Sequence, residues 1–159
     1  MQEVKIYIGS SLAGPCVKDG WYAAILECET KKGPATLGIT GGEKETTYYR
    51  TILLAVVAAL KRLKPCSAII YTDCSFIKNM YENGTAEHWR RSEWVKSDGG
   101  EVKNKELWQQ FFDEVKRLGG KKKVTFHFSK YHDYKKELQE AIEKRKKEDI
   151  QNADKAHKC

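Results

Sequence analysis

The sequence predicts an α/β fold in which a mixed sheet is flanked by helices. Five stretches rich in β-branched and aromatic residues indicate five strands, and helical stretches follow the third, fourth and fifth of them. Short links join the first three strands, which favours an antiparallel meander. A chain of 159 residues is long enough to bury a core as one domain. The expected fold is therefore a five-stranded mixed sheet, with three antiparallel strands first and parallel strands after them.

The first three strands are predicted at residues 4–8, 20–28 and 35–40. In the first of them isoleucines alternate with Lys5 and Tyr7, as expected for a half-buried strand. A Lys-Lys-Gly-Pro turn precedes the third strand. These three strands form the antiparallel half of the predicted sheet.

A helix is predicted at residues 46–63, with Thr46 or Thr47 as its cap and Pro65 at its end. Residues 52–60 are apolar on nearly every face, so we expect this helix to be buried on more than one side. The next strand ends in Asp73. Because the strand follows a crossover helix, we expect it to run parallel to the first strand, with Gly9 beside Asp73.

The rest of the chain predicts a short helix at residues 76–82, a basic insert at 88–105 and a helix at 104–118. A fifth strand follows with Val124, Phe126 and Phe128 on one face, and a last helix begins near His132. We expect one domain at residues 1–142 and a charged tail at 143–159 that is helical or disordered.

Composition gives weaker evidence about partners, location and cysteine chemistry. The formal net charge of +7 permits a polyanionic partner. No apolar stretch is as long as a membrane span and the first residues show no apolar signal region, so we expect a cytoplasmic protein without a membrane partner. The five cysteines form no CxxC pair, and we expect reduced thiols that bind no metal.

Four segments, in this order, resemble those of the type 1 ribonucleases H. They are "TTYYRTILLAVVAALKRLK", "IIYTDCSFIKNM", "WRRSEWVKSDGGEVKNKELWQQF" and "FSKYH". The third is similar to the basic handle of that family, and the resemblance extends over residues 4–138. It implies an RNase H-like fold with a basic handle insertion.

The resemblance also implies an activity, hydrolysis of the RNA strand of an RNA–DNA hybrid. In that family four carboxylates hold two divalent metals, so Mg²⁺ or Mn²⁺ is the cofactor if the protein is active. Two such ions can activate the attacking water and stabilise the leaving oxygen. Clustered acids are needed because Mg²⁺ prefers hard oxygen ligands that offset its charge.

Two of the four acid positions implied by the resemblance hold residues that cannot bind a metal. The acid at the end of the first strand falls on Gly9, and the acid on the long helix falls on Ile52. The third is present as Asp73. For Asp73 three roles stay open: a solvated acid that caps the next helix, a remnant metal ligand, or a catalytic ligand.

The fourth acid position falls on Lys136, with Asp133 and Glu137 as nearby substitutes. The candidate metal ligands are therefore Asp73, Asp133 and Glu137. His132 matches a loop histidine of the family, so the catalytic candidates are Asp73, Asp133 and His132. We expect three other acids to be surface loop charges rather than replacement ligands: Asp19, Glu43 and Glu45.

Nucleic-acid contacts are predicted at two places. The resemblance puts Thr47 and Arg50 at or near a pocket for a phosphate of the DNA strand, where Tyr48 and Tyr49 replace an asparagine pair found in many relatives. The handle combines cations with aromatic residues, a composition suited to a phosphate backbone. Its candidate residues are Trp89, Arg90, Arg91, Trp94, Lys96 and Lys103.

The leading hypothesis is an RNase H-like domain that binds an RNA–DNA hybrid or a related duplex and has lost most or all hydrolysis. One alternative is an active ribonuclease H with a rearranged carboxylate set. Another is a protein-interaction module without nucleic-acid binding.

Overall fold

The computed structural model describes residues 2–157. Its eleven elements follow the predicted order with two additions, a short helix, α3, where the basic insert was expected to begin, and a 3₁₀ turn, η1, before the last strand. They are β1 (Glu3–Ser10), β2 (Lys18–Thr30), β3 (Gly33–Thr46), α1 (Tyr48–Lys61), β4 (Ser67–Thr72), α2 (Ser75–Glu82), α3 (Thr85–Arg91), α4 (Lys105–Leu118), η1 (Lys121–Lys123), β5 (Val124–Phe128) and α5 (Lys135–His157).

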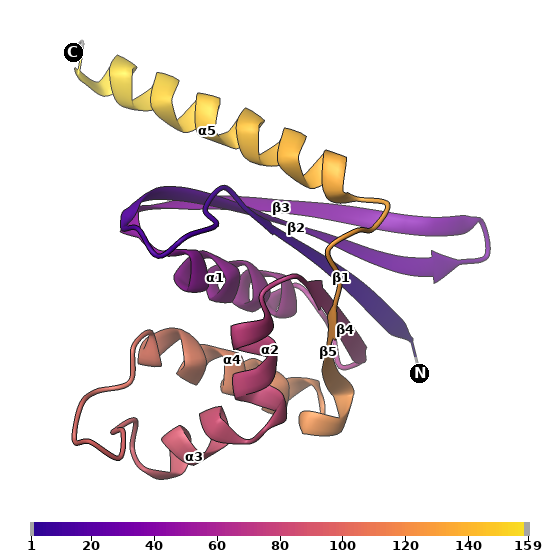
Figure 1. Ribbon diagram of the computed structural model, residues 1–159. Helices are drawn as coiled ribbons and strands as arrows, with labels where there is room; N and C mark the ends of the chain where they lie inside the picture. The colour runs from indigo at the N-terminus through magenta and orange to yellow at the C-terminus, as the bar shows by residue number, and fades with distance from the viewer. Residues whose placement is uncertain (1, 158–159) are drawn as a thin grey trace.

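The five strands form one mixed sheet in the order β3-β2-β1-β4-β5 (Figure 1). β2 pairs antiparallel with both β1 and β3, whereas β4 pairs parallel with both β1 and β5. The predicted fold class, three antiparallel strands followed by parallel strands, is confirmed. The ends of β1 and β4 lie at the same edge of the sheet, and the candidate site is built there.

β2 and β3 form a hairpin longer than predicted. β3 covers Gly33–Thr46 rather than residues 35–40, and β2 covers Lys18–Thr30 rather than 20–28. The expectation that Asp19, Glu43 and Glu45 lie in loops is therefore wrong, because all three belong to strands. Polar residues fit the extension because most side chains of β3 are solvent-exposed.

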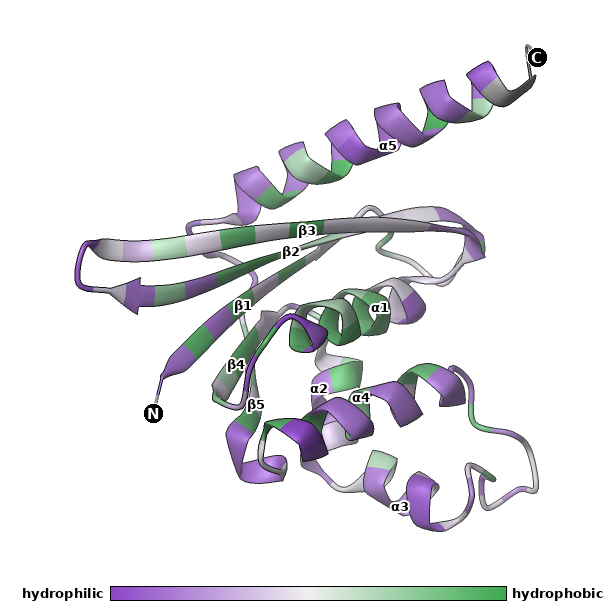
Figure 2. Ribbon diagram, turned by 180° about the vertical axis from the view of Figure 1, so that it is seen from behind, coloured by the Kyte–Doolittle hydropathy of each residue, from purple (hydrophilic) through white to green (hydrophobic). Residues whose placement is uncertain are grey.

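α1 lies on one face of the sheet, and α2, α3 and α4 lie on that same side (Figure 1). The predicted burial of α1 is confirmed, since its residues from Ile52 to Leu60 are buried except for Leu54 and Ala58. Thr47 caps the helix by accepting a hydrogen bond from the backbone N–H of Arg50. Figure 2 shows α1 as the most uniformly apolar helix.

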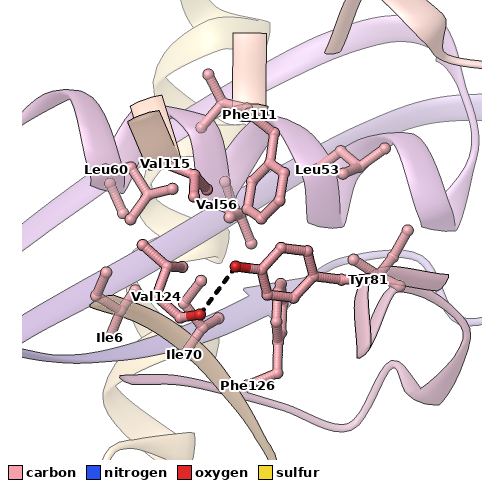
Figure 3. Packing of buried hydrophobic residues seen from close by; sticks show 14 of the residues in the cluster. Ile6, Leu53, Val56, Leu60, Ile70, Tyr81, Phe111, Val115, Val124 and Phe126 are labelled. Atoms are coloured by element: carbon pink, nitrogen blue, oxygen red, sulfur yellow. Dashed lines mark hydrogen bonds between the residues drawn. The ribbon is translucent and has the colours of Figure 1, made fainter. Parts of the chain in front are cut away.

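The main core lies between the sheet, α1 and α4. Phe111 of α4 meets the Tyr81 ring edge-on, with centroids 5.2 Å apart. The Tyr81 hydroxyl donates a hydrogen bond of 3.0 Å to the Val124 carbonyl oxygen, so its polar atom is satisfied inside the core (Figure 3). Val124 and Phe126 are buried on this face, while Phe128 at the strand end is 42% exposed.

α5 covers the opposite face of the sheet (Figure 1). Leu138 and Ile142 of α5 pack with Ala23 of β2 in a second, smaller core. Beyond residue 142 the helix continues without a break. Arg145 donates to the Thr40 carbonyl oxygen at 2.9 Å.

The charged segment predicted from residue 143 onward is thus helical as far as His157, and residues 158–159 lie outside the described part of the chain. Besides the Arg145–Thr40 hydrogen bond, a second contact joins this segment to the sheet: Asp149 accepts a hydrogen bond of 2.8 Å from the Trp21 indole N–H. Arg145 also pairs with Asp149 at 3.0 Å. Within residues 2–157 no helix is both long and apolar enough to cross a membrane.

Asp149→Ala is expected to lower the free energy of unfolding at pH 7 by less than about 1 kcal/mol, because the Arg145–Asp149 ion pair is partly exposed. The melting temperature should fall slightly. The indole hydrogen bond and Arg145 lower the pKa of Asp149. Its contribution is therefore present above the unfolded-state pKa and is lost as the pH falls through the lower folded-state pKa. Melting curves of both proteins should converge in strong acid. Asp154→Ala serves as the control. Equal losses of stability in Asp149→Ala and Asp154→Ala would contradict the stabilising role of Asp149.

Candidate nucleic-acid interface

A hollow of about 260 Å³ lies where β1 and β4 end, and we call it the edge hollow. It contains Gly9 and Asp73, so the predicted proximity of these two positions is confirmed. One wall comes from α1, and the other comes from α5 and the segment before it. The lining residues are Ile8, Gly9, Ser10, Leu12, Ala13, Tyr48, Asp73, Ser129, Lys130, His132, Lys135, Leu138, Gln139 and Ile142.

Gly9 lies directly under α5. A Cβ atom added there would lie 3.2 Å from Leu138 Cβ and 3.4 Å from Ile142 Cδ1. The first of these distances is tighter than an ordinary van der Waals contact, so the helix packs where a side chain would leave the strand. Glycine at this position therefore permits the close approach of α5 to the sheet.

Ile52 belongs to the main core, where it is 1% exposed. It does not line the edge hollow, which α1 reaches through Tyr48. The neighbouring Thr51 ties α1 to β1 instead. Its hydroxyl donates to the Tyr48 carbonyl oxygen at 2.6 Å and lies 2.7 Å from the Ser10 hydroxyl.

Asp73 follows β4 and is exposed. Its Oδ1 accepts a hydrogen bond of 3.0 Å from the Tyr48 hydroxyl. Burial, followed by the nearby Cys74 and Asp73, raises the pKa of Tyr48, so this phenol stays a protonated donor. Asp73 does not cap α2, since the residue before that helix is Cys74 and no side chain caps it.

His132 lines the edge hollow near Asp73. Burial, followed by the charge of Lys135, lowers the pKa of His132, so the imidazole is neutral at pH 7. Its Nδ1 accepts a hydrogen bond of 3.2 Å from the Tyr134 backbone N–H. Asp133 is exposed and is not among the lining residues.

The acids of the predicted metal set are not gathered at one point. Glu137, like Asp133, is exposed on or near α5 outside the hollow. Throughout residues 2–157 no three His, Cys, Asp or Glu residues are placed to hold a metal ion together. The lining of the edge hollow contains one carboxylate, Asp73, and two lysines, Lys130 and Lys135. This donor set does not fit a pair of divalent cations, which requires several clustered acids.

A second hollow of about 680 Å³ adjoins the first, and we call it the aromatic hollow. The two share Ala13 and Tyr48 as wall residues. Aromatic rings from α1, α2, α3 and α4 dominate its lining. The lining residues are Ala13, Gly14, Pro15, Thr47, Tyr48, Tyr49, Phe76, Ile77, Trp89, Lys96, Val102, Lys103, Asn104 and Trp108.

Phe76 was missed as a site residue by sequence reasoning. Its ring stacks on that of Tyr49, with centroids 4.3 Å apart and planes 19° from parallel. An aromatic residue directly after a strand end is a signal for such a role, but it is ambiguous because most such rings enter a core. Lys130, Lys135 and Asn104 were also not predicted as members of the site.

Arg50 is already neutralised by acids. Its Nε donates to Glu43 at 2.6 Å, and its Nη1 contacts both Glu106 and, at 3.3 Å, the Asn104 side-chain oxygen. The hydrogen bond to Glu43 is the main reason that the pKa of Arg50 is raised further. A phosphate at Arg50 would have to compete with two carboxylates, whereas Thr47 lines the aromatic hollow itself.

The handle residues divide into structural and surface groups. Trp94 is 7% exposed and packs near Phe112, so it serves the core. Arg90 lies over the Phe112 ring at 5.2 Å and pairs with Glu87, which also lies 3.8 Å from Arg91.

Three other handle residues face the aromatic hollow. Trp89 packs edge-on against Trp108, with centroids 6.2 Å apart, and both rings line the hollow. Lys96 and Lys103 are at its border.

Comparison with known proteins decides the family. The family model described as RNase H matches residues 1–151. The chain belongs to the RNase H family. A ribonuclease H of Thermoanaerobacter sp. (strain X514) is 37% identical over 111 residues, which cover 69% of this chain and 68% of that protein. One from Chlorobium luteolum is 32% identical over 132 residues, covering 82% and 84%.

Solved RNase H structures share the fold at low identity. LC9-RNase H1, a type 1 RNase H with the type 2 active-site motif, has a TM-score of 0.65 and 19% identity, over 84% of this chain and 65% of that chain. LC11-RNase H1, solved in complex with an RNA/DNA hybrid, has a TM-score of 0.59 and 17% identity, over 89% and 98%. The expected family and fold are both confirmed.

Proposed function

We propose that this RNase H family member binds an RNA–DNA hybrid or a related duplex and that its hydrolytic activity is lost or strongly reduced. The observation that carries the proposal is the pair Gly9 and Ile52. One is covered by α5 and the other is buried in the core. Neither position can supply a metal ligand, and they lie on separate elements.

The chemistry of the edge hollow supports this proposal. A two-metal hydrolase needs enough carboxylate charge to hold two divalent cations a few ångströms apart. Here the edge hollow is lined by one carboxylate, Asp73, and by two lysines, Lys130 and Lys135. Two ammonium groups disfavour a metal pair through charge repulsion, while they favour a phosphate.

Binding is supported by charge and by the two hollows. The net charge is +7, and lysines occur in the lining of both hollows. The related LC11-RNase H1 was solved in complex with an RNA/DNA hybrid. Together these features favour a nucleic-acid partner over a protein partner.

A hybrid-cleavage assay tests the loss of hydrolysis. With a labelled RNA–DNA hybrid and excess protein, we expect no cleavage above background in Mg²⁺ or Mn²⁺. Asp73→Asn should leave this result unchanged. Multiple turnover by the protein that disappears in Asp73→Asn would contradict the proposal.

An active enzyme with a rearranged acid set is the second candidate, favoured by the presence of Asp73 and His132 in the lining of the edge hollow. It would use Asp73, Asp133 and Glu137 with Mg²⁺ or Mn²⁺. Such an enzyme gains stability from the ion at physiological concentration. We expect no Mg²⁺- or Mn²⁺-dependent rise in melting temperature beyond that seen with Asp73→Asn, and a specific rise would favour this candidate.

Hybrid binding is expected to weaken steeply with salt, because contacts with phosphates release counterions. Fluorescence anisotropy at several KCl concentrations should give a linear fall of log K with log salt. Replacing both Lys96 and Lys103 with Ala should reduce the slope by about 2. Absence of binding even at 20 mM KCl would favour a protein-interaction module.

A further inference from the structure

We propose that the aromatic hollow receives an unpaired base of a single-stranded nucleic acid, stacked on the Tyr49–Phe76 pair. This inference rests on the proposed function, because it assumes that the domain binds nucleic acid. It names what occupies the aromatic hollow, which is an unpaired base, either in a single strand or flipped out of a duplex.

The ring pair is the first support. Tyr49 is the second residue of α1 and Phe76 the second residue of α2, and their rings stack nearly parallel with centroids 4.3 Å apart. The residues are nevertheless 42% and 36% exposed. A stacked aromatic pair left open to water offers a flat apolar surface, and any base can stack on such a surface because every base has a π-face.

The shape of the hollow is the second support. Its volume of about 680 Å³ is in the range of small-molecule sites. Trp89, Ile77 and Val102 supply apolar walls, and Thr47 and Asn104 bring polar groups that can hydrogen-bond the edge of a base. A base inside a duplex is covered by its neighbours on both faces, so only an unpaired base can use this stacking surface.

The arrangement of charge is the third support. Lys96 and Lys103 line the aromatic hollow on the handle side, and none of its described lining residues is acidic. Tyr48 forms part of both hollows, and Lys130 and Lys135 line the second one. Lysines thus lie on two sides of the aromatic surface. A strand with one base stacked there can direct the phosphates before and after it toward these two lysine pairs.

Binding to matched oligonucleotides tests the inference. The probes are a single strand, an abasic strand of the same length, and an RNA–DNA hybrid, each measured by fluorescence anisotropy at low salt. We expect the intact protein to bind the single strand at least tenfold more tightly than the abasic strand. Equal affinity for the two strands would overturn the inference, because phosphates alone would then account for binding.

Single substitutions test whether the base stacks on the Tyr49–Phe76 pair. Tyr49→Ala and Phe76→Ala should each weaken single-strand binding about tenfold and weaken hybrid binding less than that, because a paired base cannot use the stacking surface. Tyr49→Phe keeps the ring and should bind normally, as should Leu37→Ala, which removes an equally exposed apolar side chain on β3. Circular dichroism melting checks that the variants fold. Normal single-strand binding by both alanine variants would overturn the inference.

The outcomes separate this inference from the proposed function. If the intact protein binds the hybrid but not the single strand, the base site is contradicted and the proposed function stands. If it binds none of the three probes at low salt, the proposed function fails, and the base site fails with it.

Discussion

Ile52→Glu is expected to lower the free energy of unfolding by about 4 kcal/mol, without creating a metal ligand. Ile52 is 1% exposed and packs in the main core between the sheet and α4. A carboxyl group there would lose its hydration and would find only apolar neighbours. Urea unfolding measures the change, and Ile52→Val should cost only about 1 kcal/mol.

The loss should depend on pH. Burial raises the pKa of a carboxyl group, so the folded state of Ile52→Glu binds its proton more tightly than the unfolded state. The variant is therefore least destabilised near pH 4 and loses further stability as the pH rises toward the folded-state pKa. A pH-independent loss, or normal stability at pH 8, would show that the side chain at position 52 reaches water.

Gly9→Asp is expected to lower stability by about 2 kcal/mol, because the new side chain overpacks the contact between β1 and α5. Its Cβ would lie 3.2 Å from Leu138 Cβ, so the helix has to shift outward. Amide hydrogen exchange should show faster exchange in α5, and urea unfolding gives the size of the loss.

A double variant separates overpacking from other effects. Leu138→Ala keeps the Cβ atom but removes the rest of the side chain, including Cδ1, which would lie 3.7 Å from the added Cβ at position 9. If these outer atoms crowd the aspartate, Gly9→Asp should cost less in that background than in the intact protein. Purely additive losses would show that the Leu138 side chain beyond Cβ is not the obstacle. Wild-type stability of Gly9→Asp together with Mg²⁺ binding would show that α5 leaves room for an acid.

Much of the fold could be predicted from local pattern. Alternation in β1, the apolar run of α1 and the acid at the end of β4 fixed the element order and the proximity of Gly9 to Asp73. The extent of the β2–β3 hairpin could not be predicted, because its added residues are polar residues, glycines and a proline that take their strand geometry from pairing with the neighbouring strand.

The part of the candidate site that could be predicted is the lack of acidic residues at two family ligand positions. Gly9 and Ile52 are evident in the sequence once the family resemblance is recognised. The stacking of Phe76 on Tyr49 depends on how two helix starts approach each other. The neutralisation of Arg50 by Glu43 and Glu106 joins residues 7 and 56 positions apart, and pairs at such distances carry no local signal.

The sequence by itself determined the family, the mixed sheet and the absence of acids at two ligand positions, because these depend on residue identity and on periodicity along the chain. Only the tertiary structure decided what replaced the acids. Packing placed α5 over Gly9, put Ile52 in the core and brought Lys130 and Lys135 into the lining of the same hollow as Asp73. These outcomes depend on contacts between distant segments, whose geometry is set by how a whole core fills its space.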